Sequence, residues 1–243
     1  MNEQQNRVAL VTGGVIRLGK EIALALADNG FDIVLNFKTS FSEAKKTKQE
    51  IERRGKKCFI IRADVSKEKD VARMFSEIRK RYGRIDVVVN NAAIIIKANL
   101  ENTTEKIWQT VLDTNLKSVF LIAKESSEIF LKQKSGIIIN IASLGGLMAW
   151  KEHLAYSVAK AGVIHLTKIL AKELAPDICV NAIAPGTIVF PNEEITFRDT
   201  IQSIPLKQYG KPHDVTSLVI FLATTSNYIT GQIFSIDGGK SIL

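Results

Sequence analysis

The chain has 243 residues, 46% of them hydrophobic and 24% charged, which predicts one globular domain, residues 1–243, with a sizeable core. The formal net charge is +8, but the basic residues are spread along predicted helices without interleaved aromatic residues, which argues against a nucleic-acid partner. No apolar run has the length of a membrane span, and the N-terminus shows no signal-peptide pattern, so we expect a cytoplasmic protein that binds no membrane. The two cysteines are too few for a disulfide framework. No Cys/His cluster has the spacing of a metal site, so we expect no bound metal.

Short apolar runs alternate with longer amphipathic segments from the N-terminus to the C-terminus. The expected strands are Arg7–Thr12, Asp32–Phe37, Cys58–Ala63, Ile85–Asn90, Ile137–Ala142, Ile178–Ala184 and Gln232–Ile236. The expected helices are Leu18–Asn29, a charged helix ending near Arg54, Glu68–Tyr82, Glu105–Lys132 and Ala155–Leu174. Because the strands are continuously apolar, this order predicts an α/β fold with a parallel sheet covered by helices on both faces.

Two segments stand outside this regular alternation. Residues Val11–Gly19 place three glycines between the first strand and the first helix, where the backbone can turn sharply and approach a pyrophosphate at the helix N-terminus. The strict G-x-G-x-x-G spacing is absent. Residues Thr187–Ile204 are polar and contain proline, which is typical of a mobile loop. We expect this segment to form a lid that covers the substrate.

Tyr156 and Lys160 lie four residues apart, so both side chains fall on one face of a helix. An ammonium one turn away favours the phenolate and is expected to lower the pKa of the tyrosine toward a useful range. This pair alone is weak evidence, because the two residue types often meet on helices. Ser143, thirteen residues before Tyr156, and the glycine turn strengthen the catalytic interpretation.

The stretch Thr12-Gly13-Gly14-Val15-Ile16-Arg17-Leu18-Gly19 resembles the Thr-Gly-x-x-x-Gly-x-Gly fingerprint of the short-chain dehydrogenase/reductase family, with Arg17 in place of the middle glycine. Further resemblances follow later strands, at Asp64-Val65, Asn90-Asn91-Ala92-Ala93, Pro185-Gly186-Thr187 and Asp237-Gly238-Gly239. The family resemblance implies a Rossmann-type doubly wound sheet of about seven strands, with the cofactor crevice at the carboxyl ends of the strands.

The cofactor-binding residues that the resemblance implies are Thr12, Gly13, Arg17, Leu18, Gly19, Lys38, Thr39, Ser40, Asp64, Val65, Asn91, Ala92, Ala93, Tyr156, Lys160, Pro185, Gly186, Thr187 and Ile188. An NAD-specific site usually has an acidic residue at the end of the second strand. Here that strand ends Asn36-Phe37-Lys38-Thr39-Ser40, which offers a cation and two hydroxyls to a 2′-phosphate. We therefore expect NADPH, the other interpretation being that Lys38 is a solvated loop residue.

Four positions match the catalytic set of the family: Asn115, Ser143, Tyr156 and Lys160. The resemblance implies that Ser143 holds the substrate oxygen, Tyr156 donates a proton to it, and Lys160 binds the nicotinamide ribose and stabilises a phenolate-like Tyr156. Asn115 would hold a water that relays protons. His153 either lines the substrate site with Met148 and Trp150 or is a solvated loop residue.

The substrate is less well defined than the chemistry. Residues Ile137–Leu174 most resemble 3-oxoacyl-(acyl-carrier-protein) reductases, with an acidic acyl carrier protein as the partner. Of the basic positions that would dock this carrier, Lys172 fills one, but Glu128 lies near another. Arg17 and Phe190-Pro191-Asn192-Glu193 instead resemble pteridine reductases, although those commonly have Asp where this chain has Ser143.

Two expectations concern the whole protein. The resemblance implies a homotetramer or homodimer, formed by the helix that carries Tyr156 and the long helix before it. A role as a non-catalytic NADPH-binding sensor or scaffold also stays open, because some members of this fold have lost catalysis. All four catalytic positions are occupied by the residues of the family set, which favours an enzyme that reduces a carbonyl to an alcohol.

Overall fold

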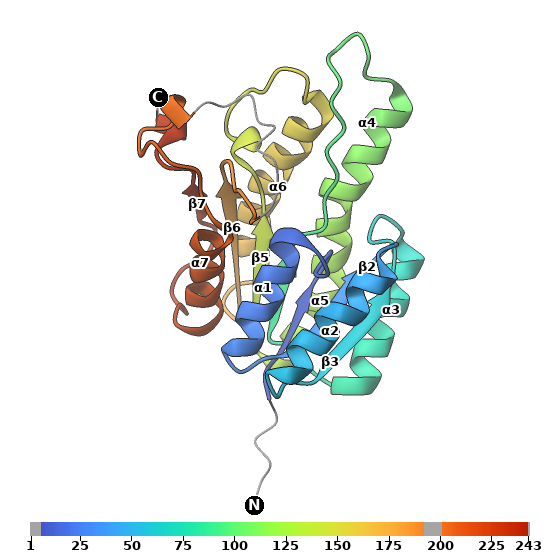
Figure 1. Ribbon diagram of the computed structural model, residues 1–243. Helices are drawn as coiled ribbons and strands as arrows, with labels where there is room; N and C mark the ends of the chain where they lie inside the picture. Colours follow the sequence, from blue (N-terminus) through green and yellow to red (C-terminus); the bar gives the residue numbers. More distant parts are fainter. Residues whose placement is uncertain (1–5, 192–200, 243) are drawn as a thin grey trace, which may run out of the picture.

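The computed structural model describes residues 6–191 and 201–242. Seven strands form one sheet in the order β3-β2-β1-β4-β5-β6-β7, and all neighbouring strands are parallel (Figure 1). The strands are β1 (Val8–Val11), β2 (Asp32–Phe37), β3 (Cys58–Arg62), β4 (Val87–Asn90), β5 (Gly136–Ile141), β6 (Ile178–Pro185) and β7 (Ile233–Ile236). The predicted doubly wound parallel sheet is confirmed.

Helices cover both faces of the sheet, as the apolar strands require. One face packs against α1, α2 and α7, and the other against α3, α5 and α6. The bounds are α1 (Arg17–Asp28), α2 (Phe41–Arg53), α3 (Glu68–Tyr82), α4 (Glu105–Leu112), α5 (Ser118–Gln133), α6 (Leu154–Glu173) and α7 (Pro212–Thr224). Alternate residues of β1 serve the two faces: Ala9 and Val11 join the first core, and Val8 and Leu10 join the second.

Helix α7 has no counterpart among the predicted elements. Its start carries ordinary signals, because Pro212 is in the first turn and the Asp214 carboxylate accepts a hydrogen bond of 2.6 Å from the Lys211 backbone N–H. Val215, Val219 and Leu222 are buried against the sheet at helical spacing. Both signals are present in the sequence and are typical of a helix at this position.

The single helix predicted over Glu105–Lys132 is interrupted in the structure. Between α4 and α5 lies a π-helical turn, η1 (Asp113–Lys117), whose wider hydrogen bonding changes the angular position of the residues that follow. Asn115 lies in this turn and is buried. Isolated π-helical turns frequently occur at functional sites, and this one contains a predicted catalytic residue.

Helix α6 qualifies by length and composition as a membrane span, with a mean hydropathy of 1.2, which corrects the expectation that no segment does. In the structure it packs against the sheet instead, because Val163 and Ile164 lie against Ala182 and Ala184 of β6. Tyr156 and Lys160 occupy its first turns. An apolar helix in this position is explained by its burial in the core.

The segment expected to form a lid, Thr187–Ile204, is described only at its two ends, because residues 192–200 lie outside the described residues. The first end is held by Gly210, whose carbonyl accepts from Val189 N at 2.9 Å and whose N–H donates to the Thr187 carbonyl at 3.0 Å. At the second end Ile204 is buried. Lid closure stays a prediction.

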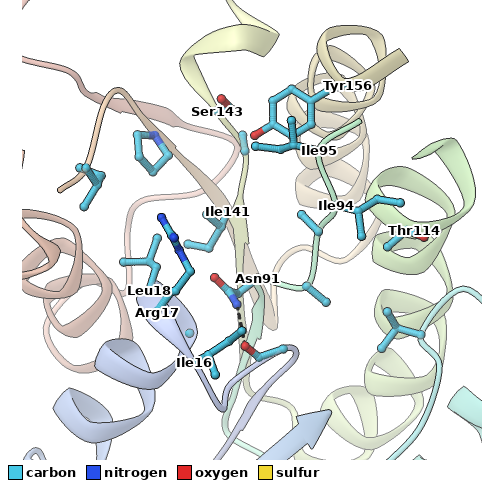
Figure 2. Close-up of a pocket in the computed structure, with 18 of the residues that line it drawn as sticks. Ile16, Arg17, Leu18, Asn91, Ile94, Ile95, Thr114, Ile141, Ser143 and Tyr156 are labelled. Carbon is cyan, nitrogen blue, oxygen red and sulfur yellow. Dashed lines mark hydrogen bonds between the residues drawn. The ribbon is translucent and has the colours of Figure 1, made fainter. Parts of the chain in front are cut away.

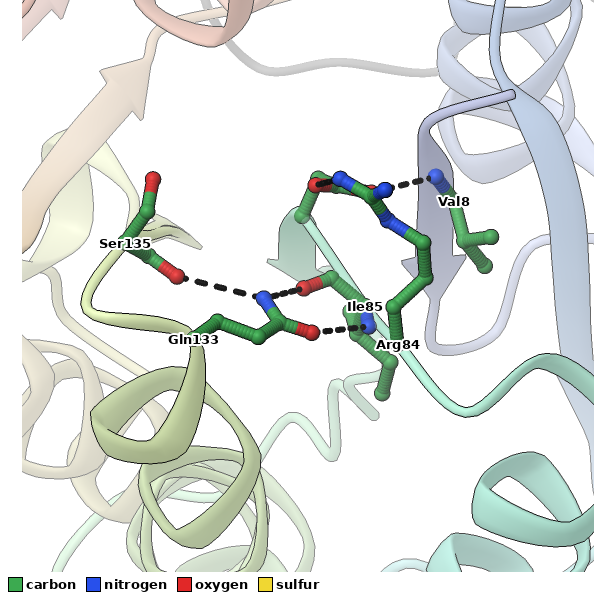
Figure 3. A network of polar contacts seen from close by, with 6 residues as sticks. Val8, Arg84, Ile85, Gln133 and Ser135 are labelled. Carbon is green, nitrogen blue, oxygen red and sulfur yellow. Dashed lines mark hydrogen bonds and ion pairs between the residues drawn. The ribbon is translucent and has the colours of Figure 1, made fainter. Parts of the chain in front are cut away.

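At the amino ends of the strands, Gln133 at the end of α5 clamps the loop before β4 (Figure 3). Its amide oxygen accepts from Ile85 N at 3.1 Å, and its amide nitrogen donates to the Ile85 carbonyl at 2.6 Å and to the Ser135 carbonyl at 3.3 Å. Asp86 next to it accepts from Val8 N at 2.7 Å and pairs with Arg84. These contacts join the end of α5 and the start of β1 to the loop before β4.

Replacing Gln133 by Ala is expected to lower the free energy of unfolding by about 1–3 kcal/mol, because it removes both partners of the Ile85 backbone. Urea denaturation measures the loss, with the exposed neighbour Lys132→Ala as the control. The two variants are expected to keep the same kcat, since these contacts lie at the amino ends of the strands, opposite the expected cofactor crevice. Equal stability of the two variants would show that the clamp contributes nothing.

Candidate active site

A cavity of about 1030 Å³ lies at the carboxyl ends of the strands, between the glycine turn and the first turns of α6 (Figure 2). It is lined by residues that follow six of the seven strands, β7 being the exception. All the predicted site residues line it except Thr12, Asn115 and Lys160. These three residues are buried. Each forms a hydrogen bond with the backbone of a segment next to the cavity: Thr12 with Ala92, Asn115 with Ile94, and Lys160 with Ile141.

Thr12 and Asn91 join the glycine turn to the end of β4. The Thr12 hydroxyl accepts from the backbone N–H groups of Asn91 at 3.0 Å and Ala92 at 3.1 Å. The Asn91 amide donates in return to the carbonyls of Thr12 at 3.0 Å and Gly13 at 3.1 Å. Thr12 therefore holds the two loops together, and it does not line the cavity itself.

The glycine turn has the shape of a cradle for a phosphate. Gly13 has a φ of 60°, a left-handed conformation that favours glycine. A side chain at Gly19 would collide with the Gly13 carbonyl, and one at Gly14 would lie 2.9 Å from the Val11 carbonyl. The backbone segments can pack this closely only without side chains, which leaves the N-terminus of α1 accessible to an anion.

Arg17 also has a left-handed backbone, with a φ of 48°. Glycine adopts this conformation without strain, which explains why it is the residue at this position of the family fingerprint. An arginine in the same conformation is strained. The guanidinium lies over the Phe190 ring, 4.7 Å from its centroid, and it reaches from the turn into the cavity (Figure 2). Arg17 thus connects the phosphate turn to the first part of the segment expected to form the lid.

Lys38 at the end of β2 forms an ion pair with Asp64 at the end of β3, with 2.8 Å between Nζ and Oδ2. Burial acts to raise the pKa of Asp64, but hydrogen bonds from Lys38 and Ser66 outweigh it and hold this pKa below its usual value. The Lys38 side chain is 64% exposed and lines the cavity. Both residues were predicted to bind the cofactor, and the structure pairs them with each other.

Ser143 and Tyr156 meet at the end of the cavity remote from the glycine turn, and Figure 2 shows the Tyr156 hydroxyl turned toward Ser143. The Ser143 hydroxyl also accepts from Gly145 N at 3.1 Å, at the start of η2 (Leu144–Gly146). Gly146 packs directly on α6, since a Cβ there would lie 2.7 Å from the Lys160 carbonyl carbon. This close packing fixes Ser143 relative to the tyrosine.

Burial dominates the ionisation of Tyr156 and Lys160. It raises the pKa of Tyr156, and the hydrogen bond from Ser143 offsets only part of the rise. It lowers the pKa of Lys160 to about 8. The Lys160 ammonium donates to the Ile141 carbonyl at 2.6 Å and lies 5.9 Å from the centre of the tyrosine ring. The expectation that Lys160 lowers the pKa of Tyr156 is therefore wrong for this structure.

Asn115 uses its whole side chain to hold the segment after β4. Its Oδ1 accepts from Ile94 N at 2.9 Å, and its Nδ2 donates to the Ile94 carbonyl at 2.8 Å. Ile94 lines the cavity beside Asn91 and Ala92. The side chain of Asn115 is thus a positioning group, and its part in a water relay stays a prediction.

The far end of the cavity has an aromatic wall. Trp150 and His153 line it, whereas Met148 does not. The rings of Trp150 and Tyr156 are nearly parallel, with centroids 6.4 Å apart and 13° between the planes. A side chain at Gly145 would lie 2.8 Å from the indole, so this glycine lets Trp150 pack close to the backbone that follows Ser143. Of the two interpretations of His153, the structure favours the one in the site.

Several lining residues escaped sequence reasoning, among them Asn36, Ile94, Lys97 and Lys151. Asn36 orders the glycine turn, because its backbone carbonyl accepts from Gly14 N at 3.2 Å. A buried polar residue inside an apolar strand is a usable signal, and Asn36 meets it. The two lysines lie in loops without a recognisable motif, so no such signal exists for them.

Comparison with known proteins agrees with this geometry. The family model described as enoyl-(acyl carrier protein) reductase matches residues 14–241. A protein from Synechocystis sp. named 3-oxoacyl-[acyl-carrier-protein] reductase is 43% identical over 237 residues, which cover 96% of each chain. The chain belongs to the short-chain dehydrogenase/reductase family. A relative of the same name from Staphylococcus epidermidis is 40% identical over 240 residues, covering 96% of this chain and 98% of that one.

The solved structures lead to the same family. The crystal structure of acetoin dehydrogenase from Enterobacter cloacae superimposes with a TM-score of 0.90 at 33% identity, covering 98% of this chain and 97% of that one. Enzymes of the family use a nicotinamide cofactor, and the cradle formed by Gly13, Gly19 and the start of α1 fits its pyrophosphate. The protein is thus an oxidoreductase of this family.

Replacing Lys160 by Met is expected to change how stability depends on pH. The pKa of Lys160 is lowered from 10.5 to about 8, so the folded state binds fewer protons than the unfolded state between these values. The wild type therefore gains stability as pH rises through this window, and the variant lacks this gain. From pH 7 to pH 10 the variant should lose about 2 kcal/mol relative to wild type.

Urea denaturation of both proteins at neutral and alkaline pH measures this difference. The other titrating groups are common to the two proteins and cancel in the comparison. A stability difference that stays constant over the range would show that Lys160 titrates normally in the folded protein.

Proposed function

We propose that the protein is an NADPH-dependent reductase that converts a 3-oxoacyl group, carried by an acyl carrier protein, to the 3-hydroxyacyl group. The observation that carries this proposal is the meeting of the Ser143 and Tyr156 hydroxyls at one end of a cavity whose other end is a phosphate cradle. Two hydroxyls turned toward one point suit a single substrate oxygen, which a carbonyl supplies.

The roles of the residues follow from their positions. Bound reduced nicotinamide would supply the hydride that adds to the carbonyl carbon. Tyr156 gives its phenolic proton to the carbonyl oxygen, which becomes the alcohol, and its raised pKa keeps that proton in place at neutral pH. Ser143 holds the same oxygen by a hydrogen bond. Lys160 lies behind the tyrosine, and its ammonium donates to the Ile141 carbonyl, which would hold the end of β5 and Ser143 in place.

The preference for NADPH rests on the end of β2. Lys38, Thr39 and Ser40 line the cavity there, and Arg17 approaches from the glycine turn. The carboxylate nearest to this loop is that of Asp64, and its charge is paired with Lys38. A 2′-phosphate would therefore meet a cation and two hydroxyls, in place of the acidic residue that suits a free ribose.

The acyl-carrier substrate is supported by the names of the relatives at 43% and 40% identity. A smaller carbonyl is the second candidate, because the superimposable structure is of an acetoin dehydrogenase and because the bulky Trp150 side chain lines the far end of the cavity. Parallel assays of NADPH consumption with a 3-oxoacyl thioester, a small diketone and a dihydropterin separate these substrates. Turnover of the diketone or the pterin alone would overturn the acyl-carrier proposal.

Association into a homotetramer or homodimer is supported by exposed apolar residues on the two helices expected to form the interface. Phe120 of α5 is 48% exposed, and Val158 and Ile169 of α6 are 45% and 40% exposed. The cytoplasmic location and the acidic carrier protein as a partner stay predictions.

Replacing Tyr156 by Phe removes the proton donor and is expected to lower kcat by about 10²–10⁴-fold, with cofactor affinity unchanged. Stopped-flow or steady-state NADPH consumption gives the first quantity, and quenching of protein fluorescence by NADPH gives the second. Tyr228→Phe is the control, since Tyr228 is 100% exposed. Undiminished turnover of the Tyr156→Phe variant would show that Tyr156 is not the proton donor.

Replacing Lys38 by Ala is expected to raise the KM for NADPH by about fivefold and to leave the KM for NADH nearly unchanged. Lys46→Ala is a matched control, because both side chains are 64% exposed and each forms one ion pair with a carboxylate. Equal effects on the two cofactors would show that Lys38 does not bind the 2′-phosphate.

A further inference from the structure

Two lysines line the substrate end of the cavity and have no function in the chemistry described so far. Lys97 follows the Ile94 segment, and Lys151 follows Trp150. Both side chains belong to exposed residues, and neither forms an ion pair or hydrogen bond with any residue in the described part of the chain. Each is therefore a solvated cation at the opening of an otherwise largely apolar chamber.

The backbone holds the two lysines on one rim. Ala98 N donates to the Glu152 carbonyl at 2.8 Å, and Leu154 N donates to the Ala98 carbonyl at 3.4 Å. These bonds form a short parallel bridge between Ala98 and His153, so the residue before Ala98 lies beside the segment that contains Lys151. The two loops would otherwise be independent, since they follow different strands.

Glu152 within this bridge has a φ of 61°, in the left-handed region that favours glycine. A strained backbone at a cavity rim is often retained for a functional reason. Here the conformation occurs at the residue whose carbonyl accepts from Ala98, so the strain and the pairing of the two loops occur together. The rim is thus formed by two loops that backbone hydrogen bonds hold side by side.

The charges at this rim favour an anion. The described ionisable residues that line it are Lys97, Lys151, Glu152 and His153. The His153 Nδ1 lies 2.9 Å from the Lys151 carbonyl and must carry a proton to donate to it, which a neutral imidazole can do. The two lysines and the one glutamate leave one positive charge in excess at this rim.

The other cations of the cavity are engaged elsewhere. Lys38 is paired with Asp64, and Arg17 stacks on Phe190 at the cofactor end. The rim lysines adjoin the Trp150–Tyr156 wall instead, which is the side from which a substrate must approach the catalytic hydroxyl. Their location assigns them to the substrate and not to the 2′-phosphate of the cofactor.

We propose that Lys97 and Lys151 form an anion-binding subsite that holds an oxyanion group of the substrate while its carbonyl lies at Tyr156. This deepens the proposed function, on which it rests. The phosphates of a phosphopantetheine arm and the carboxylate of a free oxo acid share this chemistry. Hydrogen bonds to a charged group contribute about 1.5–3 kcal/mol, so losing both lysines should cost about tenfold or more in kcat/KM.

The test compares substrates that share one 3-oxobutyryl group and differ in charge. These are the coenzyme A thioester, which carries phosphates, the neutral N-acetylcysteamine thioester, and free 3-oxobutyrate. The variants are Lys97→Gln, Lys151→Gln and the double variant. Lys106→Gln on α4 is the matched control, because Lys106 is exposed, has no ion-pair partner among the described residues and does not line the cavity.

We expect the double variant to lose about tenfold or more in kcat/KM with the coenzyme A thioester and less than twofold with the neutral thioester. A loss confined to 3-oxobutyrate would instead identify a carboxylate as the natural anion. Equal losses with charged and neutral substrates, or no loss with either anion, would overturn the subsite.

A binding measurement keeps this test separate from that of the proposed function. Calorimetric titration of the same three compounds into protein saturated with NADP⁺ needs no turnover. If wild type reduces none of them, the proposed reaction fails. The subsite then stands if the double variant weakens binding of either anion selectively, and it falls if wild type binds the anions no more tightly than the neutral thioester.

Discussion

The arrangement of the site depends on the hydrogen bonds that join the ends of β1 and β4. At this point the strand order reverses, so the two following loops diverge and leave a crevice between them. Thr12 and Asn91 each bind the backbone of the other loop, which fixes the width of that crevice at its base. The glycine turn, the Ile94 segment and, through Asn115, the π-helical turn all take their positions from this junction.

At Tyr156 and Lys160, burial changes the pKa values more than neighbouring charges do. Lys160 is 3% exposed and hydrogen-bonds a sheet carbonyl, while Tyr156 is 7% exposed. A low-dielectric setting disfavours both the ammonium and the phenolate. The protein therefore keeps a neutral phenol ready to give up a proton, at the cost of holding a buried lysine whose charged form is destabilised. Function and stability are opposed at this residue.

Much of the fold and of the site follows from local patterns in the sequence. The seven apolar runs predicted the sheet, and the glycine turn with Tyr156 and Lys160 located the cavity. Other features depend on contacts between distant segments, which spacing does not encode. Examples are the Lys38–Asp64 pair between two strand ends and the bridge from Ala98 to His153. The π-helical turn around Asn115 has the same periodic apolar pattern as an ordinary helix, so periodicity did not predict it.

The strand order also has a consequence for how the chain assembles as it is synthesised. β2 and then β3 add on one side of β1, and β5, β6 and β7 each add beside the strand made just before. Only β4 must return to an earlier strand, when Val87–Val89 pair with Ala9–Val11. The pairing of β4 with β1 is thus the single long-range step between two series of pairings of consecutive strands. The rate of this step should limit how early the nascent chain buries the apolar edge of β1.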